Sequence, residues 1–239
     1  MKKVLSILLV VFTLGMLTSC SNDDENNYYV NVGGFTMVNA YTGDDAVQYF
    51  ANGNPLQGYS TPLVYKNFGF AKLYSGNRSI LIRGMRSNER IAASNLRVDN
   101  NRFYSSFIGG TKENTIHFTT EDRVTEVSLL DATNLCGVRF FNLSADAGKF
   151  SLKFDEEAIK PVFKDRVADS QATAPKSQVF VPVEAKTYKL SILDQNNTVI
   201  ATKEGVTLAK GASYSIFLIG TKTMVNKEYY IGVLKQPVN

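Results

Sequence analysis

YSSFIGGT at residues 104–111 recurs 110 positions later as YSIFLIGT at residues 214–221. Tyr, Ser, Phe, Gly and Thr hold the same places in both copies. In the first copy, Tyr104, Ser106 and Ile108 share one face of an extended segment, because successive side chains of a strand point to opposite faces. The two copies therefore predict the same β-strand twice.

A second match places this strand in a larger repeat. Residues 38–40 (VNA) are answered by residues 141–143 (FNL), 103 positions later. Two matches in the same order at nearly the same spacing indicate a duplicated module of about 100 residues. Short alternating runs separated by Gly, Asn and Pro are typical of β-sandwiches. We predict an all-β chain with two tandem immunoglobulin-like β-sandwich domains, at residues 33–133 and 134–239.

One segment of the second module has no counterpart in the first. Residues 155–177 depart from the strand pattern, with a possible helical turn at 156–165 and a polar stretch at 170–177. Because a polar insertion into a repeated scaffold is most easily placed on the surface, we expect a flexible loop there.

The N-terminus indicates where the modules reside. Residues 1–3 are basic, residues 4–14 form an apolar run too short to span a bilayer, and Cys20 ends a Leu-Thr-Ser-Cys tetrapeptide that resembles the bacterial lipobox. We predict a lipoprotein signal peptide at 1–19, lipid (palmitate) attachment at Cys20 and a flexible acidic tether at 20–32. Acidic residues 23–25 resemble the surface-export signal of Bacteroidetes-type lipoproteins, which predicts an outer-membrane protein displayed at the cell surface.

Charge and cysteine content exclude several classes of protein. The formal charge of +4 includes two signal-peptide lysines, so a mature chain carries only about +2, too little for nucleic-acid binding by charge. If Cys20 carries lipid, Cys136 has no cysteine to pair with, so each domain must rely on a packed apolar core.

Residues capable of catalysis or metal binding are few. The single histidine, His117, is expected to be exposed on a strand, and Cys136 to be partly buried between the domains. Neither has a partner in the sequence that would make it a nucleophile, a base or a metal ligand. Acidic turns at 42–45 and 194–197 lack alternating Asp residues, so turn formation explains them better than calcium. We predict no enzyme activity, no cofactor and no metal.

A binding role is the remaining expectation, with a glycan or an envelope protein as ligand. Tyr59 and Tyr65 lie outside the predicted strands, where aromatic rings are more often exposed. Ser170, Thr173 and Lys176 lie in the predicted loop and are the other candidates for contact. Arginines between residues 78 and 102 fit ordinary solvated strand edges better than an anion site.

The opening of the second module resembles a known family. Arg139, Asn142, Ser144 and Asp146, followed later by the strand at 214–220, resemble the join between tandem copies of the bacterial domain-of-unknown-function family 4397. The first module departs from the pattern, since residues 36–38 stand where the arginine is expected. The resemblance implies paired β-sandwich modules of the cell envelope and supplies no catalytic residues.

The sequence thus predicts a surface lipoprotein with a non-catalytic structural or binding role. Two alternatives stay open: an envelope hydrolase built on the same scaffold, and a periplasm-facing assembly factor that contacts other proteins through an exposed sheet edge.

Overall fold

The computed structural model describes residues 31–58, 60–124 and 134–237, and Asn31–Asn239 form one compact unit. Several predicted features lie outside the described residues: the signal peptide, the lipid site at Cys20, nearly all of the tether, and Tyr59. In the part that is described, no helix is long and apolar enough to cross a membrane.

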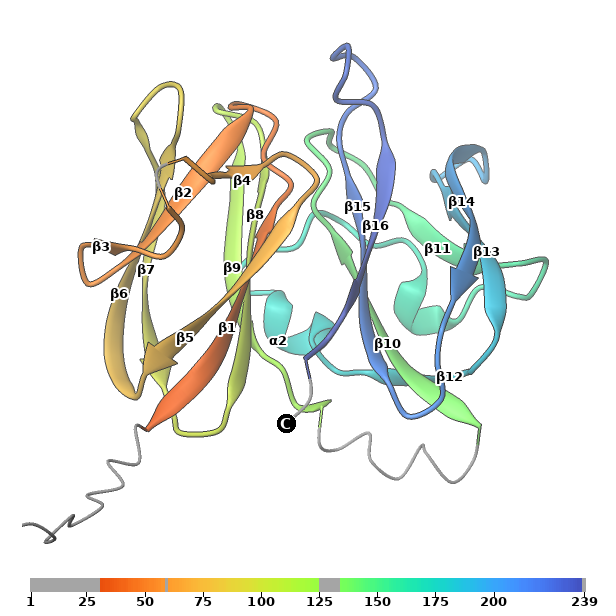
Figure 1. The fold of residues 1–239 in the computed structure, drawn as a ribbon. Helices are drawn as coiled ribbons and strands as arrows, with labels where there is room; N and C mark the ends of the chain where they lie inside the picture. The colour runs from red at the N-terminus through yellow and green to blue at the C-terminus, as the bar shows by residue number, and fades with distance from the viewer. Residues whose placement is uncertain (1–30, 59, 125–133, 238–239) are drawn as a thin grey trace, which may run out of the picture. The chain divides into compact units, whose positions relative to one another are not determined.

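The first half is a sandwich of two sheets (Figure 1). One sheet has the order β5-β1-β8-β9, formed by Phe68–Tyr74, Val32–Asn39, Phe103–Gly110 and Thr115–Glu121. The other has the order β3-β2-β6-β7, formed by Asn54–Pro55, Ala46–Ala51, Gly76–Gly84 and Arg90–Val98, and β4 (Leu63–Val64) pairs with β2. Apolar residues of both sheets, among them Phe35, Tyr49 and Ile82, form one buried cluster between them.

The second half repeats this plan (Figure 1). One sheet has the order β12-β10-β15-β16, formed by Val181–Glu184, Leu135–Asn142, Ser213–Ile219 and Tyr230–Lys235. The other has the order β11-β13-β14, formed by Ser151–Phe154, Thr187–Leu193 and Val199–Thr207. A second buried cluster, which includes Phe140, Leu190 and Ile216, fills the space between these sheets. The predicted all-β sandwich fold is therefore confirmed.

Strand register shows that the two halves are copies of one module. β1 runs parallel to β8 with Gly34 opposite Phe103, and β10 runs parallel to β15 with Gly137 opposite Ser213, which is the same pairing shifted by the repeat. The two repeated tyrosines, Tyr104 and Tyr214, also accept equivalent hydrogen bonds. The Tyr104 hydroxyl accepts from the amide of Asp99 (3.1 Å), five residues upstream, and the Tyr214 hydroxyl accepts from Ala209 (2.9 Å) in the same way.

The repeated strands are buried on both faces. Every residue of β15, and every residue of β8 from Tyr104 to Gly110, is buried. One face of each strand belongs to its own sandwich core, while the other joins a third cluster that combines residues of both halves. At its centre the Phe107 ring lies 4.8 Å from the Phe141 ring. The sheet containing β8 and the sheet containing β15 thus pack against each other. The domain boundary at 133/134 falls in residues that are not described and stays a prediction.

The insertion is anchored by buried side chains, although many of its residues lie at the surface as expected; its flexibility stays a prediction. It contains η2 (Pro161–Phe163) and α2 (Ala174–Ser177), and the side chains of Phe163 and Ala174 are fully buried. The buried Asp169 carboxylate accepts hydrogen bonds from the Asn142 amide (2.8 Å) and the Ser177 hydroxyl (2.7 Å). The polar sequence is therefore satisfied internally rather than by solvent.

Candidate functional site: a loop pocket in the second half

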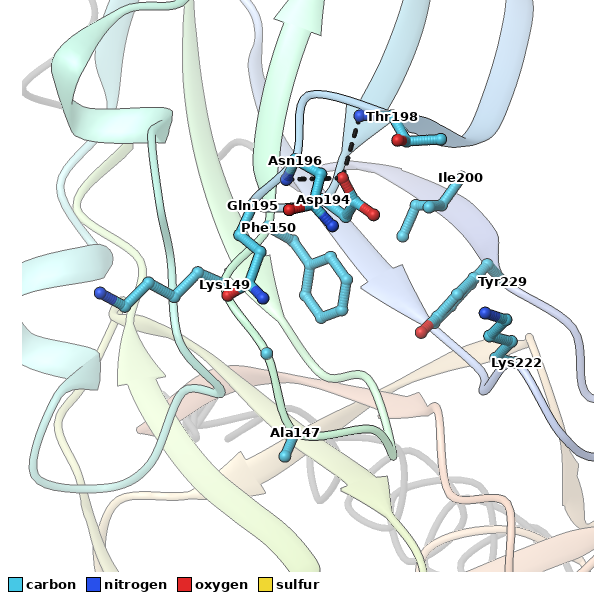
Figure 2. Close-up of a pocket in the computed structure, with 11 residues that line it drawn as sticks. Ala147, Lys149, Phe150, Asp194, Gln195, Asn196, Thr198, Ile200, Lys222 and Tyr229 are labelled. Carbon is cyan, nitrogen blue, oxygen red and sulfur yellow. Dashed lines mark hydrogen bonds between the residues drawn. The ribbon is translucent and has the colours of Figure 1, made fainter.

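A pocket lies where three connections of the second half converge. These are the chain between β10 and β11, the β13–β14 turn and the β15–β16 loop. The pocket has a volume of about 460 Å³ (Figure 2). Its lining residues are Ala147, Gly148, Lys149, Phe150, Asp194, Gln195, Asn196, Thr198, Ile200, Lys222 and Tyr229.

Two aromatic rings and one aliphatic side chain form the apolar part of the pocket. Phe150, at the start of β11, is almost fully buried, and its ring packs edge to face against Tyr229 at 5.8 Å. Figure 2 shows Ile200 and Tyr229 together on one side of the Phe150 ring. Tyr229 and Ile200 are half-buried, so each presents part of its apolar surface to the pocket.

Asp146 fixes the orientation of Tyr229. Its carboxylate accepts hydrogen bonds from the Tyr229 hydroxyl (2.6 Å), the Thr221 hydroxyl (2.6 Å) and the Lys222 amide (2.7 Å). Burial acts to raise the pKa of Asp146, but these hydrogen bonds outweigh it and hold the pKa below its usual value. Burial and the neighbouring carboxylate raise the pKa of Tyr229. The pair is therefore a carboxylate and a neutral phenol at neutral pH.

The polar rim is built on the β13–β14 turn. The Asp194 carboxylate accepts from the amides of Asn196 (2.8 Å) and Thr198 (2.9 Å), drawn as dashed lines in Figure 2. Asn197 adopts a left-handed conformation (φ 61°), which asparagine tolerates in turns. The turn was correctly predicted from its sequence. It leaves the side chains of Gln195, Asn196 and Thr198 exposed at the pocket.

Lys222 places an ammonium group near the Tyr229 ring, whereas the Lys149 side chain extends away from the Phe150 ring (Figure 2). Lys149 and Lys222 are exposed, and within the described part of the chain neither forms an ion pair. The two carboxylates nearby, Asp146 and Asp194, already accept two or three hydrogen bonds each. A ligand therefore meets amide, hydroxyl and ammonium groups around an apolar floor.

The corresponding loops of the first half form a different surface. A shallow pocket of about 330 Å³ is lined by residues 42–45, Arg86 and Ser87, with no aromatic ring. Asp44 there accepts from the backbone amides of Ser87 (3.1 Å) and Ala46 (3.3 Å), so it stabilises the loops. Lys227, from the β15–β16 loop, reaches Asp45 across the two halves, with 3.2 Å between Nζ and Oδ1.

Those predicted binding residues that the structure describes, Tyr65, Ser170, Thr173 and Lys176, do not line the aromatic pocket. Tyr65 is half-buried rather than exposed, and the Lys227 ammonium lies 4.2 Å from its ring centre. Burial raises its pKa to about 12. Ser170 and Thr173 bond to each other at the start of α2, with the Ser170 amide 2.8 Å from the Thr173 hydroxyl. Thr173 and the exposed Lys176 border a separate hollow. A binding role for these residues stays a prediction.

Neither His117 nor Cys136 has the environment expected for it. His117 is half-buried, its Nε2 lies 3.2 Å from the Ser106 hydroxyl, and burial lowers its pKa to about 4. Because Ser106 is fully buried, this pair cannot reach a substrate. Cys136 is fully buried in the core of the second half rather than between domains, and burial raises its pKa to about 11. The described residues hold no group of three His, Cys, Asp or Glu suited to a metal.

Arg139, which sequence reasoning used only as part of a family pattern, is the largest fully buried side chain. Its Nη2 lies 2.6 Å from Oδ1 of Asp122, and its Nε donates to the Ser215 hydroxyl at 2.7 Å. Phe180 lies over the guanidinium at 4.6 Å. Burial lowers the pKa of Arg139, and Asp122 opposes that shift. The role of this arginine is to join the two halves.

The other pattern residues support the pocket loop. Asn142 accepts from the Ser144 amide (3.1 Å), the Ser144 hydroxyl donates to the Gly220 carbonyl (3.2 Å), and Asp146 holds Tyr229 as described. The spacing of Asn142, Ser144 and Asp146 is therefore the sequence signal for the geometry of this loop. Tyr229 itself carried no comparable signal.

Comparison with known proteins identifies no family. No family model matches the sequence, and no curated protein matches it either. Among solved structures, the chain is similar to the carbohydrate-binding module CBMbc (family CBM26) of Eubacterium rectale Amy13K in complex with maltoheptaose, with 12% identity over 87% of this chain and 98% of that one and a TM-score of 0.26. A DUF3823 family protein from Bacteroides ovatus shares 11% identity over 74% of this chain and 98% of its own, with a TM-score of 0.20. At such low TM-scores the likeness carries no argument about function.

Proposed function

We propose that this protein is a lipid-anchored, non-catalytic protein of the outer cell envelope that binds oligosaccharides through the pocket around Phe150 and Tyr229. The observation that carries the proposal is the pairing of an apolar aromatic floor with a rim of amide, hydroxyl and ammonium groups. Its volume of about 460 Å³ lies within the usual range of small-ligand sites.

The chemistry of a sugar ring fits this arrangement. A pyranose presents an apolar face of C–H groups, which packs on aromatic surface, and hydroxyls at its edge, which exchange hydrogen bonds with polar side chains. Gln195, Asn196 and Thr198 offer both donors and acceptors. The carboxylates of Asp146 and Asp194 balance the positive charge of Lys149 and Lys222, so the pocket has no charge preference for uronic-acid sugars over neutral ones.

The position of the pocket is consistent with display away from a membrane anchor. The chain enters the first sandwich at the start of β1, where the Ser75 amide donates to Asn31 (2.9 Å). β1 and β10 end close together, since the Gly110 amide beside the end of β1 contacts the Leu143 carbonyl after β10 (3.4 Å). The pocket follows the end of β10, so within the described chain it lies at the opposite end of the strands from Asn31.

Binding of maltoheptaose and of an oligogalacturonide, measured by calorimetry, tests the ligand class. We expect Tyr229→Ala to weaken binding at least tenfold, because it removes the ring and its link to Asp146. Arg86→Ala, in the aromatic-free pocket of the first half, is the matched control and should bind as the wild type does. Equal affinity of a folded Tyr229→Ala variant would place the site elsewhere, and failure of both sugars would contradict the ligand class.

The anchor has its own test. Cys20→Ser should abolish incorporation of labelled palmitate and release the protein from the membrane fraction, since the thiol is the predicted attachment point. Protease added to intact cells should degrade the wild-type protein if it faces outward. Palmitate labelling of the serine variant would contradict the lipoprotein proposal, and full protease protection would favour the periplasm-facing alternative.

A further inference from the structure

We infer that β5 is an association edge through which two copies of this chain pair as antiparallel strands. Three large apolar side chains on one face of β5 are exposed: Phe68 (55%), Phe70 (50%) and Tyr74 (66%). Lys72, on the same face, is also exposed. The opposite face is tied to the sandwich core through Leu73, which is buried. An exposed apolar row on an edge strand is a ready site for strand pairing.

The backbone of β5 leaves its outer edge open. β5 ends the sheet order β5-β1-β8-β9, so β1 is its only neighbour among the described strands of that sheet (Figure 1). The Ser75 amide donates to Asn31, and the Asn67 carbonyl accepts from Asn39, so odd-numbered residues of this segment bond to β1. Because the direction alternates along a strand, the amides and carbonyls of residues 68, 70, 72 and 74 point to the open edge. The Tyr74 carbonyl already accepts a hydrogen bond from Arg78 Nε (2.7 Å) there, so the free groups of the edge are those of residues 68, 70 and 72 and the Tyr74 amide.

The equivalent edge of the second half is closed. β12 pairs with β10 as β5 pairs with β1, with Pro182 opposite Gly137 where Lys72 is opposite Gly34. Proline has no amide hydrogen and blocks pairing at that position. β12 is also only four residues long, whereas β5 has seven. Phe180, the counterpart of Phe70, covers Arg139 and is half-buried. The duplicated module thus has one blocked edge and one open apolar edge.

The sequence of β5 is complementary to itself. If Ala71 lies on a two-fold axis, Phe68 faces Tyr74 of the second copy and Phe70 faces Lys72 of the second copy. These pairs are aromatic–aromatic and cation–π contacts, both favourable between neighbouring strands. This register also places the open amides and carbonyls of Phe70 and Lys72 opposite each other, while at the Phe68–Tyr74 pair the second copy must share the Tyr74 carbonyl with Arg78. Pairing centred on Lys72 would instead oppose two ammonium groups.

Charge reversal at one exposed position tests this register. Sedimentation velocity of the purified full chain over a range of concentrations should show a reversible dimer. Phe70→Lys should weaken dimerisation at least tenfold, because it opposes Lys72 of the second copy, whereas Phe70→Glu should retain most of it by forming an ion pair there. Thermal melting of both variants should match the wild type, since residue 70 is exposed. Equal weakening by both charges would overturn the register.

Two further variants separate a paired edge from other contacts. The double variant Phe70→Cys/Lys72→Cys should form a covalent dimer on oxidation, with much less from either single variant, while Cys136 stays buried. Lys72→Pro, which copies the blocked edge of β12, should abolish the dimer without affecting the bonds to β1. A wild type that is monomeric at all concentrations would overturn the proposal. So would monomeric protein that binds phosphatidylglycerol vesicles through Phe70, because β5 would then be a membrane surface.

Discussion

Thr36 and Arg139 hold the same position in the two halves, since each lies opposite the repeated serine, Ser105 or Ser215. The Thr36 side chain is short, whereas the long Arg139 side chain extends to Asp122, which follows β9 of the first half. The buried Gln236 is the counterpart of Asp122 in the second half. The Asp122 amide donates to the Phe103 carbonyl at the start of β8, and the Gln236 amide donates to the Ser213 carbonyl at the start of β15. The copies therefore diverged in matched pairs, so that one half supplies the cation and the other the anion.

A second exchange shows the same complementarity in shape. Phe118 lies opposite Phe107 in the first half, and Gly232 lies opposite Phe217 in the second. A Cβ atom added to Gly232 would overlap the Phe217 ring. The ring therefore occupies space that is free only because residue 232 has no side chain. Phe107, Phe118 and Phe217 all belong to the shared cluster. The two halves have the same backbone plan but are no longer interchangeable.

The largest effect is expected from breaking the buried ion pair. Arg139→Met should lower the free energy of unfolding of the full chain by about 3–5 kcal/mol, because Asp122 would remain buried and unpaired. Chemical denaturation measures this loss. Arg139→Met/Asp122→Leu should recover most of it, since no uncompensated charge remains. A loss below about 1 kcal/mol in the single variant would show that the pair does not couple the halves.

A smaller loss is expected where the halves differ in shape. Gly232→Ala should destabilise the chain by about 1–3 kcal/mol, because the Phe217 ring must move within a packed cluster. Gly205→Ala is a steric contrast, because nothing lies within 4 Å of an added Cβ there, although its φ of 68° is itself unfavourable for alanine. Thermal melting compares them. Wild-type stability of Gly232→Ala would mean that Phe217 has space that the structure does not show.

The smallest effect is expected at His117, whose counterpart across the repeat is Ile231. Its pKa is lowered from 6.5 to about 4, so the unfolded chain binds a proton more readily. The stabilising contribution of the neutral ring is therefore present above pH 6.5 and is lost as the pH falls toward 4. His117→Ile should reduce the loss of unfolding free energy between pH 7 and pH 4.5 by about 1 kcal/mol. The effect is small because the ring is partly exposed. Unfolding measured at pH 7 and pH 4.5 checks it, and an unchanged slope would assign the acid sensitivity to other groups.

The repeat and the strands were predictable because their signals are local. A period-two pattern, and its recurrence at nearly constant spacing, located β8 and β15 within a residue or two of their ends. That these strands are buried on both faces was not predictable. The Ser105 hydroxyl, for example, donates to Asp122 (2.6 Å), seventeen residues away, inside the contact between the halves. Nothing near Ser105 in the sequence indicates that contact.

The same limit applies to the candidate site and to the insertion. The pocket draws residues from three connections far apart in the chain. Only two of its features had a local sequence signal: the turn at Asp194 and the pattern from Asn142 to Asp146. The insertion looked mobile because it is polar, but Asp169 and Ser177 satisfy each other in a buried network. His117 alternates with apolar residues, which predicted exposure, yet it is half-buried and its Nε2 lies 3.2 Å from the buried Ser106 hydroxyl of β8.

The parallel pairing of β1 with β8 has a consequence for how the chain folds. β1 is the first strand to be synthesised, but one of its two neighbours, β8, starts about seventy residues later. In the second half, β10 likewise precedes its parallel neighbour β15 by a long stretch of chain. Topologies dominated by such distant contacts fold slowly, on the scale of milliseconds to seconds. A chain that emerges from its N-terminus cannot complete the first sandwich before β8 has emerged, or the second sandwich before β15 has emerged. Each module therefore stays incomplete, with β1 or β10 missing one neighbour, for most of the time that the module takes to emerge.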